Sequence, residues 1–140
     1  MRLVLDANEY IFALANPWTP SRDLVALLGA DPQYDVRIVR ILVEEVLKNS
    51  PERSHRRFFS TLDLILEDGC GIDEDFLIPY ARGEHFREVG FKEADALIAA
   101  YAEAVGADVL VSENRRHFHT MSDRLPFRVM DAERFIKLNR

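Results

Sequence analysis

Arg2-Leu3-Val4-Leu5-Asp6-Ala7-Asn8 opens the chain with an apolar run that stops at an acidic residue. The residues from Arg2 to Leu5 are typical of a short buried strand, and the pattern from Asn8 to Asn16 predicts a helix that must end before Pro17. Asp6 therefore stands at the junction of a strand and a helix. A buried strand that leads directly into a helix is the start of a strand–helix–strand unit, so this stretch favours an α/β fold.

The alternation of strands and helices continues through the rest of the chain. Further strands are predicted at Val36 to Val39, from Ile72, at Val109 to Val111 and at Pro126 to Met130. Further helices are predicted at Pro20 to Gly29, Ile41 to Lys48, Glu52 to Glu67, Lys92 to Val105 and Asp131 to Leu138, with a short helix and a loop in Phe76 to Gly90. This order predicts a three-layer α/β/α fold with a mainly parallel central sheet, because parallel connections must cross over the sheet.

The composition fits one domain over residues 1–140. The chain has 140 residues, 48% of them hydrophobic, and a chain of this length buries roughly two-thirds of the surface that its unfolded form exposes. No apolar run approaches the roughly 20 residues of a membrane span, and we expect neither a membrane segment nor a secretory signal. The lone Cys70 allows no internal disulfide and no cysteine-based zinc site, which fits a reducing cytoplasm. The net charge of −6 weighs against broad, non-specific binding to duplex nucleic acid.

Polar groups from four segments are predicted to meet at one edge of the sheet. Asp6 directly follows the first strand, and the segment Ser112 to Asn114 directly follows the strand that ends at Val111. Glu45 and Asp95 lie within about two turns of the starts of helices, and a helix that follows a parallel strand begins at this same edge. Open sheets of this kind bind ligands beyond the carboxyl ends of their strands. We therefore expect a functional crevice there.

Carboxylates gathered in this way favour a bound divalent cation. Three of them would repel one another by about 3 kcal/mol per pair, at roughly 5 Å spacing and an effective dielectric constant near 20. Magnesium and similar hard cations prefer carboxylate and amide oxygens. One or two such ions could activate a water molecule and orient a phosphodiester for in-line displacement. Taken singly, Asp6 could instead cap a helix, and Asp95 could simply be stabilised by a helix dipole.

Four segments, in order along the chain, resemble the motifs of PIN domains. The run Leu3-Val4-Leu5-Asp6-Ala7-Asn8 resembles their opening strand and D-x-N signature. The segments Ile41 to Leu47 and Lys92 to Ala100 resemble their second and third acidic helices. The segment Gly106 to Phe118 is similar to their fourth motif, in which a hydrophobic strand precedes T-x-D or T-x-N. The resemblance thus extends from Leu3 to about Phe118.

The resemblance implies a PIN-like fold and a metal-dependent endoribonuclease, a phosphodiester hydrolase that cleaves single-stranded RNA with Mg²⁺ or Mn²⁺. Small stand-alone members are frequently VapC-type toxins of toxin–antitoxin pairs, so it also implies an antitoxin partner and a homodimer through the apolar faces of the first helices. The catalytic and metal-binding residues that it implies are Asp6, Glu45, Asp95 and Asn114. The residues expected to contact substrate or support these ligands are Asn8, Ser112, Arg115 and Arg116.

Two departures from the family pattern leave questions open. Asn114 stands where the fourth acid of the family usually stands, and a neutral ligand favours one-metal chemistry or an attenuated rate. Glu44 competes with Glu45 as the acid of the second motif, although Glu45 precedes the aliphatic Val46 as the motif asks.

Two alternative functions and several structural interpretations also stay open. A silent PIN scaffold that binds RNA or protein would be consistent with Asn114. An aspartyl phosphotransfer domain would use Asp6 as a nucleophile, but such families need a D-x-D or a paired acid that this chain lacks. Asn8 could orient Asp6 or cap the helix, and Ser112 could hold phosphate or only shape a turn. Arg115 and Arg116 could grip an RNA backbone or belong to a solvated turn.

Overall fold

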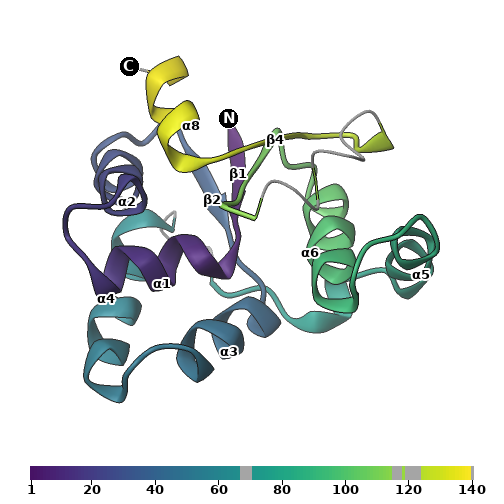
Figure 1. The fold of residues 1–140 in the computed structure, drawn as a ribbon, viewed down its shortest axis with the longest axis horizontal. Coiled ribbons are helices and arrows are strands. Elements are labelled where there is room, and N and C mark those ends of the chain that lie inside the picture. Colours follow the sequence, from purple (N-terminus) through teal and green to yellow (C-terminus); the bar gives the residue numbers. More distant parts are fainter. Residues whose placement is uncertain (67–70, 115–117, 119–123, 140) are drawn as a thin grey trace.

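A four-stranded parallel sheet forms the centre of the computed structural model, which describes residues 1–66, 71–114, 118 and 124–139. The strands are β1 (Arg2–Leu5), β2 (Asp35–Arg37), β3 (Val109–Val111) and β4 (Arg128–Met130), in the spatial order β2-β1-β3-β4. Every neighbouring pair is parallel, so the predicted sheet is confirmed (Figure 1).

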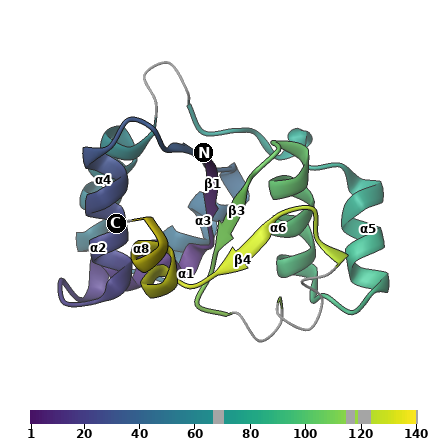
Figure 2. The same cartoon turned by 90° about the horizontal axis from the view of Figure 1, so that it is seen from above.

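Helices cover both faces of this sheet, as Figure 2 shows from above. One side carries α1 (Ala7–Ala15), α2 (Pro20–Ala30), α4 (His55–Ile65) and α8 (Ala132–Asn139), and the other carries α6 (Glu93–Ala104) with α5 (Tyr80–Glu88) packed outside it. The helix α3 (Arg40–Lys48) follows β2 and packs against α1. Short 3-10 turns occupy Glu52–Ser54 and Asp75–Leu77. Within the described ranges, no helix combines the length and the apolar character needed to cross a bilayer.

The strands are apolar because both of their faces are buried. Leu3, Val4, Leu5, Leu110 and Val111 are fully inaccessible to solvent, as expected of parallel strands that lie between two helical layers. The register places Leu3, Val4 and Leu5 opposite Val109, Leu110 and Val111. The residues that follow these two strands are consequently brought side by side.

The predicted elements agree with the structure except in a few places. No strand begins at Ile72: Asp73 forms only an isolated bridge to Val39 before the chain enters the 3-10 turn. The helix predicted from Glu52 begins as a 3-10 turn and ends at Ile65, and Glu67 lies outside the described residues. The weak pattern from Phe76 to Gly90 contains a nine-residue helix, α5, whose N-cap is Pro79.

An acidic side chain is buried where α1 meets α2. Glu9 is fully inaccessible, and its Oε2 accepts a hydrogen bond of 2.7 Å from the hydroxyl of Ser21. Its other oxygen, Oε1, has no hydrogen-bond partner among the described residues. The pKa of Glu9 is raised from its ordinary value of 4.5 to about 8, mainly by burial and also by the charges of Glu113, Asp6 and Asp131, while the Ser21 bond lowers it. The folded protein thus holds Glu9 in its neutral form at pH 7.

Replacing Glu9 by glutamine is expected to weaken the pH dependence of stability. Between pH 4.5 and 8 the unfolded chain releases the Glu9 proton while the folded chain keeps it, so stability is full below 4.5 and falls as pH rises to 8. The fall is on the order of a few kcal/mol, and Glu9→Gln should remove most of it. Urea unfolding at pH 5 and pH 8 with chelator measures this, with the exposed Glu52→Gln as control. An unchanged pH slope in Glu9→Gln would contradict the neutral, buried carboxyl.

Candidate functional site

Asp6 lies at the carboxyl edge of the sheet, immediately after β1, and is 7% exposed. Its Oδ1 accepts a hydrogen bond of 2.8 Å from the backbone N–H of Ala7, and its Oδ2 accepts one of 2.8 Å from the hydroxyl of Ser112. Asp6 is also the N-cap of α1. One carboxyl group therefore both starts a helix and meets the end of the neighbouring strand.

Ser112 holds this carboxyl from the end of β3. It is fully buried, its hydroxyl donates to Asp6, and the same oxygen accepts a bond of 3.1 Å from the backbone N–H of Asn114. The backbone is fixed as well, because the N–H of Asp6 donates to the carbonyl of Val111 and that of Ser112 donates to the carbonyl of Met130. The hydroxyl faces Asp6 rather than solvent, which makes Ser112 a support for that carboxyl.

Glu45 on α3 and Asp95 on α6 share the electrostatic environment of Asp6. Burial raises the pKa of Asp6 against its two hydrogen bonds, and the charge of Asp95 raises it further. Burial likewise raises the pKa of Glu45, followed by the charges of Asp6 and Asp95. The three acids predicted from the sequence thus interact electrostatically, from a strand end and two helices.

Glu44 and Glu45 differ in their surroundings. Glu45 is half-buried, whereas Glu44 is exposed and interacts with the charge of Arg40. A hollow of about 370 Å³ lies beside Glu45. It is lined by Ile41, Glu44, Glu45, Lys48, Asn49, Ala94 and Ile98. The partial burial of Glu45 and its electrostatic interaction with Asp6 favour Glu45 over Glu44 as the acid of this site.

The donor set fits a hard cation, although it is not gathered around one point. Its atoms are carboxylate oxygens, the ligands that magnesium and manganese prefer. In residues 1–66, 71–114, 118 and 124–139, no three His, Cys, Asp or Glu side chains already lie close enough to hold one metal ion together. Side-chain rotation would be needed for Asp6, Glu45 and Asp95 to share an ion.

A further acid near the site was missed by the sequence analysis. Glu9 interacts electrostatically with Asp6, Glu113 and Asp131. The available signal was its spacing, since residues three apart share one face of a helix and Glu9 stands three residues after Asp6. The spacing of hydrophobic residues does not indicate that this glutamate is buried in an otherwise apolar contact between helices.

The remaining predicted residues are placed unevenly. Asn8 is half-buried, and its side chain makes no hydrogen bond within the part of the chain that the structure describes, so the capping role belongs to Asp6. Asn114 is half-buried beside Ser112. Arg115, Arg116 and Cys70 lie outside the described residues.

Neither the models of known protein families nor the curated proteins match the sequence of this chain. Solved structures do match its fold. One match is a chain in the crystal structure of VapBC2 from Rickettsia felis bound to a DNA fragment from the VapBC2 promoter. It superposes with a TM-score of 0.60 at 21% identity, over 94% of this chain and 98% of that one. A chain of VapBC-1 from nontypeable Haemophilus influenzae gives 0.64 at 18% identity, over 95% and 99%. The chain therefore shares its fold with these chains, in agreement with the three-layer, PIN-like α/β/α fold that the sequence predicts.

Proposed function

We propose that this chain is a metal-dependent endoribonuclease that cleaves single-stranded RNA. The observation that carries the proposal is the electrostatic interaction of Asp6, Glu45 and Asp95 at the carboxyl edge of the sheet. Burial and then the charge of Asp95 raise the pKa of Asp6, and burial and then the charges of Asp6 and Asp95 raise the pKa of Glu45. An arrangement that disfavours its own ionised state is typical of a site built for a positively charged ligand.

Mg²⁺ or Mn²⁺ would be held by Asp6, Glu45 and Asp95, with the side-chain amide of Asn114 as a neutral ligand. The ion would supply the positive charge that in-line hydrolysis of a phosphodiester requires. Ser112 would keep Asp6 in one orientation, because its hydroxyl donates to Oδ2 at 2.8 Å. A supporting hydrogen bond of this kind fixes the direction of a ligand and tunes its affinity.

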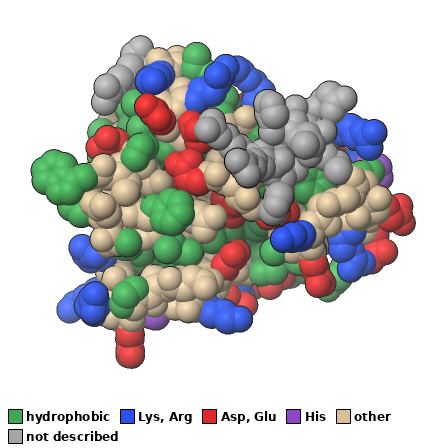
Figure 3. Space-filling view, in the orientation of Figure 1, with side chains coloured by type: hydrophobic (Ala, Val, Ile, Leu, Met, Phe, Trp, Pro, Cys, Tyr) green, Lys and Arg blue, Asp and Glu red, His purple; other side chains and the backbone are tan. Residues whose placement is uncertain are grey.

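The surface and the similar structures support the proposed substrate and partner. Acidic and basic side chains are mixed over the described part of the face in Figure 3, and the net charge is −6. Such a surface gives little general attraction for a duplex, so binding would depend on the cation and on local contacts. The two similar structures are both VapBC complexes, which supports a role as the toxin of a toxin–antitoxin pair with an antitoxin as its protein partner.

A catalytically silent PIN scaffold is the second candidate. Asn114 favours it, because a neutral side chain stands where the resemblance expects a fourth acid. Activity of the purified chain in manganese separates the two functions.

Removal of any one of the three acids is expected to abolish cleavage. Labelled single-stranded RNA is incubated with the protein in Mn²⁺, Mg²⁺ or chelator, and cleavage should require metal. Asp6→Asn, Glu45→Gln and Asp95→Asn should each reduce the rate by about a hundredfold or more, since the ion contributes several kcal/mol to the transition state. The adjacent Glu44→Gln should stay within about twofold of the native rate. Cleavage that persists in Asp6→Asn would place the activity elsewhere, and no cleavage by the native chain in any metal would favour the silent scaffold.

Loss of the Ser112 hydroxyl should weaken the site without emptying it. Ser112→Ala removes the bond to Asp6 Oδ2 and is expected to reduce metal affinity or cleavage by about 10- to 100-fold. Ser112→Thr keeps the hydroxyl and serves as the matched control. Titration with Mn²⁺ and the cleavage assay measure the two effects; equal behaviour of the alanine and threonine variants would refute a supporting role.

A fourth acid should strengthen the site. Asn114→Asp is expected to tighten Mn²⁺ binding by about tenfold, which corresponds to about 1.4 kcal/mol. Asn8→Asp is the control, because it adds the same charge two residues after Asp6 at a position that is not an expected ligand. If both variants tighten binding equally, the gain reflects added charge alone and Asn114 is not a ligand.

A further inference from the structure

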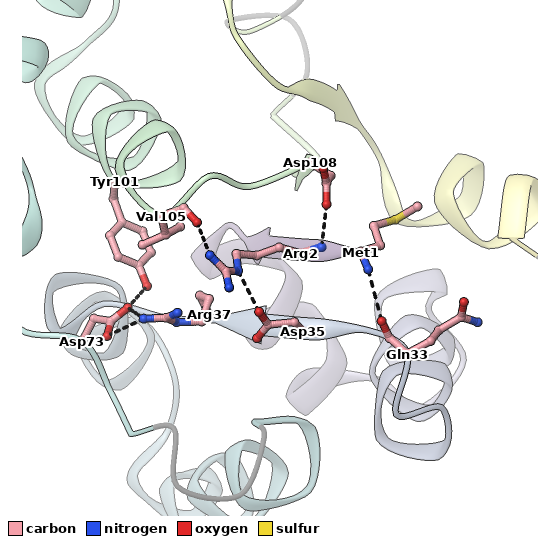
Figure 4. Close-up of polar contacts among 9 residues, drawn as sticks. All are labelled: Met1, Arg2, Gln33, Asp35, Arg37, Asp73, Tyr101, Val105 and Asp108. Carbon is pink, nitrogen blue, oxygen red and sulfur yellow. Dashed lines mark hydrogen bonds and ion pairs between the residues drawn. The ribbon is translucent and has the colours of Figure 1, made fainter.

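Asp73 connects the strand β2 with the helix α6. Both of its carboxylate oxygens accept hydrogen bonds from Nη2 of Arg37, at 3.0 and 2.9 Å, and Oδ2 also accepts one of 2.6 Å from the hydroxyl of Tyr101. Arg37 is the last residue of β2, and Tyr101 belongs to α6. Figure 4 shows the side chains of Arg37 and Tyr101 converging on this one carboxyl group.

The backbone around Asp73 is tied to the start of α3. Its N–H donates to the carbonyl of Ile38 at 2.8 Å, and its carbonyl accepts from the N–H of Arg40 at 2.8 Å. The next two acids continue the connection: Glu74 accepts two bonds from the guanidinium of Arg40, and Asp75 accepts from the N–H of Ile41 at 3.0 Å.

These bonds replace a cap that α3 lacks. Its N-cap residue, Val39, has no side-chain acceptor, and the first N–H groups of a helix need partners from outside the helix. The segment 73–75 supplies them. The start of α3 is therefore fixed by a segment more than thirty residues later in the sequence, and the same segment is held to α6 by Tyr101.

The two helices joined in this way carry Glu45 and Asp95. Glu45 lies on α3 and Asp95 in the first turn of α6. Between them is the hollow of about 370 Å³ lined by Ile41, Glu45, Ala94 and Ile98, among others. Side chains do not fill this space, so the hydrogen bonds of Asp73 are a constraint on the two helices in addition to packing.

The connection is built to be rigid. The side chains of Arg37 and Asp73 are 21% and 14% exposed, and Tyr101 is fully buried. Burial raises the pKa of Tyr101, and its bond to Asp73 raises it further, so the phenol stays protonated and remains a donor. Charged hydrogen bonds that are shielded from water are short and directional.

We infer that Asp73 is a positioning residue that sets the separation of Glu45 and Asp95 through Arg37, the start of α3 and Tyr101. The inference rests on the proposed metal site. It assigns a role to a residue outside all four motifs of the resemblance. Asp73 acts through the two helices, and its effect should be seen in metal affinity, which depends on how closely the carboxylates can approach one ion.

Binding of Mn²⁺, followed by the loss of its free electron paramagnetic resonance signal, tests this role. Tyr101→Phe removes only the bond to α6 and keeps the ring in the core. We expect it to weaken Mn²⁺ binding by about tenfold, and Asp73→Asn to weaken it in the same direction. Thermal unfolding confirms that each variant is folded.

Asp35→Asn is the matched control. Asp35 lies on the same strand as Arg37, at the opposite end of β2, and forms a partly buried ion pair with Nε of Arg2 at 2.7 Å (Figure 4). This variant should lose stability while its Mn²⁺ affinity stays native. If the native chain binds Mn²⁺ and folded Tyr101→Phe binds it equally well, the positioning role is overturned. Equal weakening in Asp35→Asn would also overturn it, because the effect would then follow general stability. A native chain that binds no Mn²⁺ overturns the metal site itself.

Discussion

The pairing of β1 with β3 is the constraint on which the site depends. β1 lies inside the sheet, with β2 on one side and β3 on the other, and its backbone is committed to both neighbours. The register that sets Leu5 beside Val111 also sets Asp6 beside Ser112. A shift of one residue would turn every buried side chain of β1 toward the opposite face. The packing that stabilises the sheet therefore also specifies which polar groups meet at its edge.

Two acidic side chains at or near the site are buried away from water. Asp6 and Glu9 are both buried, and burial is the largest cause of the raised pKa of each. Ser112 and Ser21 each donate one hydrogen bond to these carboxyls, which offsets part of the desolvation. Neutral carboxyls are the less costly state in such surroundings. A bound cation would shift this balance toward the ionised forms, so cation binding and proton release from this region should be coupled.

The sequence predicts those parts of the molecule that leave a local pattern. The strands and most helices follow from the spacing of apolar residues, and Asp6, Glu45 and Asp95 follow from their positions after strands or near helix starts. Asp73 could not be predicted as a connecting residue, because its partners Arg37 and Tyr101 are far away in the sequence and nothing in their spacing marks them. The prediction of a strand from Ile72 is wrong, because contacts between distant segments again decide the structure. The backbone of Asp73 makes one hydrogen bond with Ile38 and one with Arg40, and the residues that follow cap α3 instead of extending the sheet.

The two interpretations of Asp6, as a helix cap and as a ligand, are compatible in this geometry. Oδ1 accepts from the N–H of Ala7, and Oδ2 accepts from Ser112. An ionised carboxylate offers about four lone-pair positions, so these two bonds leave capacity for a cation on each oxygen. The cap fixes the carboxyl at the helix start, where the dipole of α1 favours its negative charge. The capping bond thus counteracts burial and helps to keep Asp6 available as an anion.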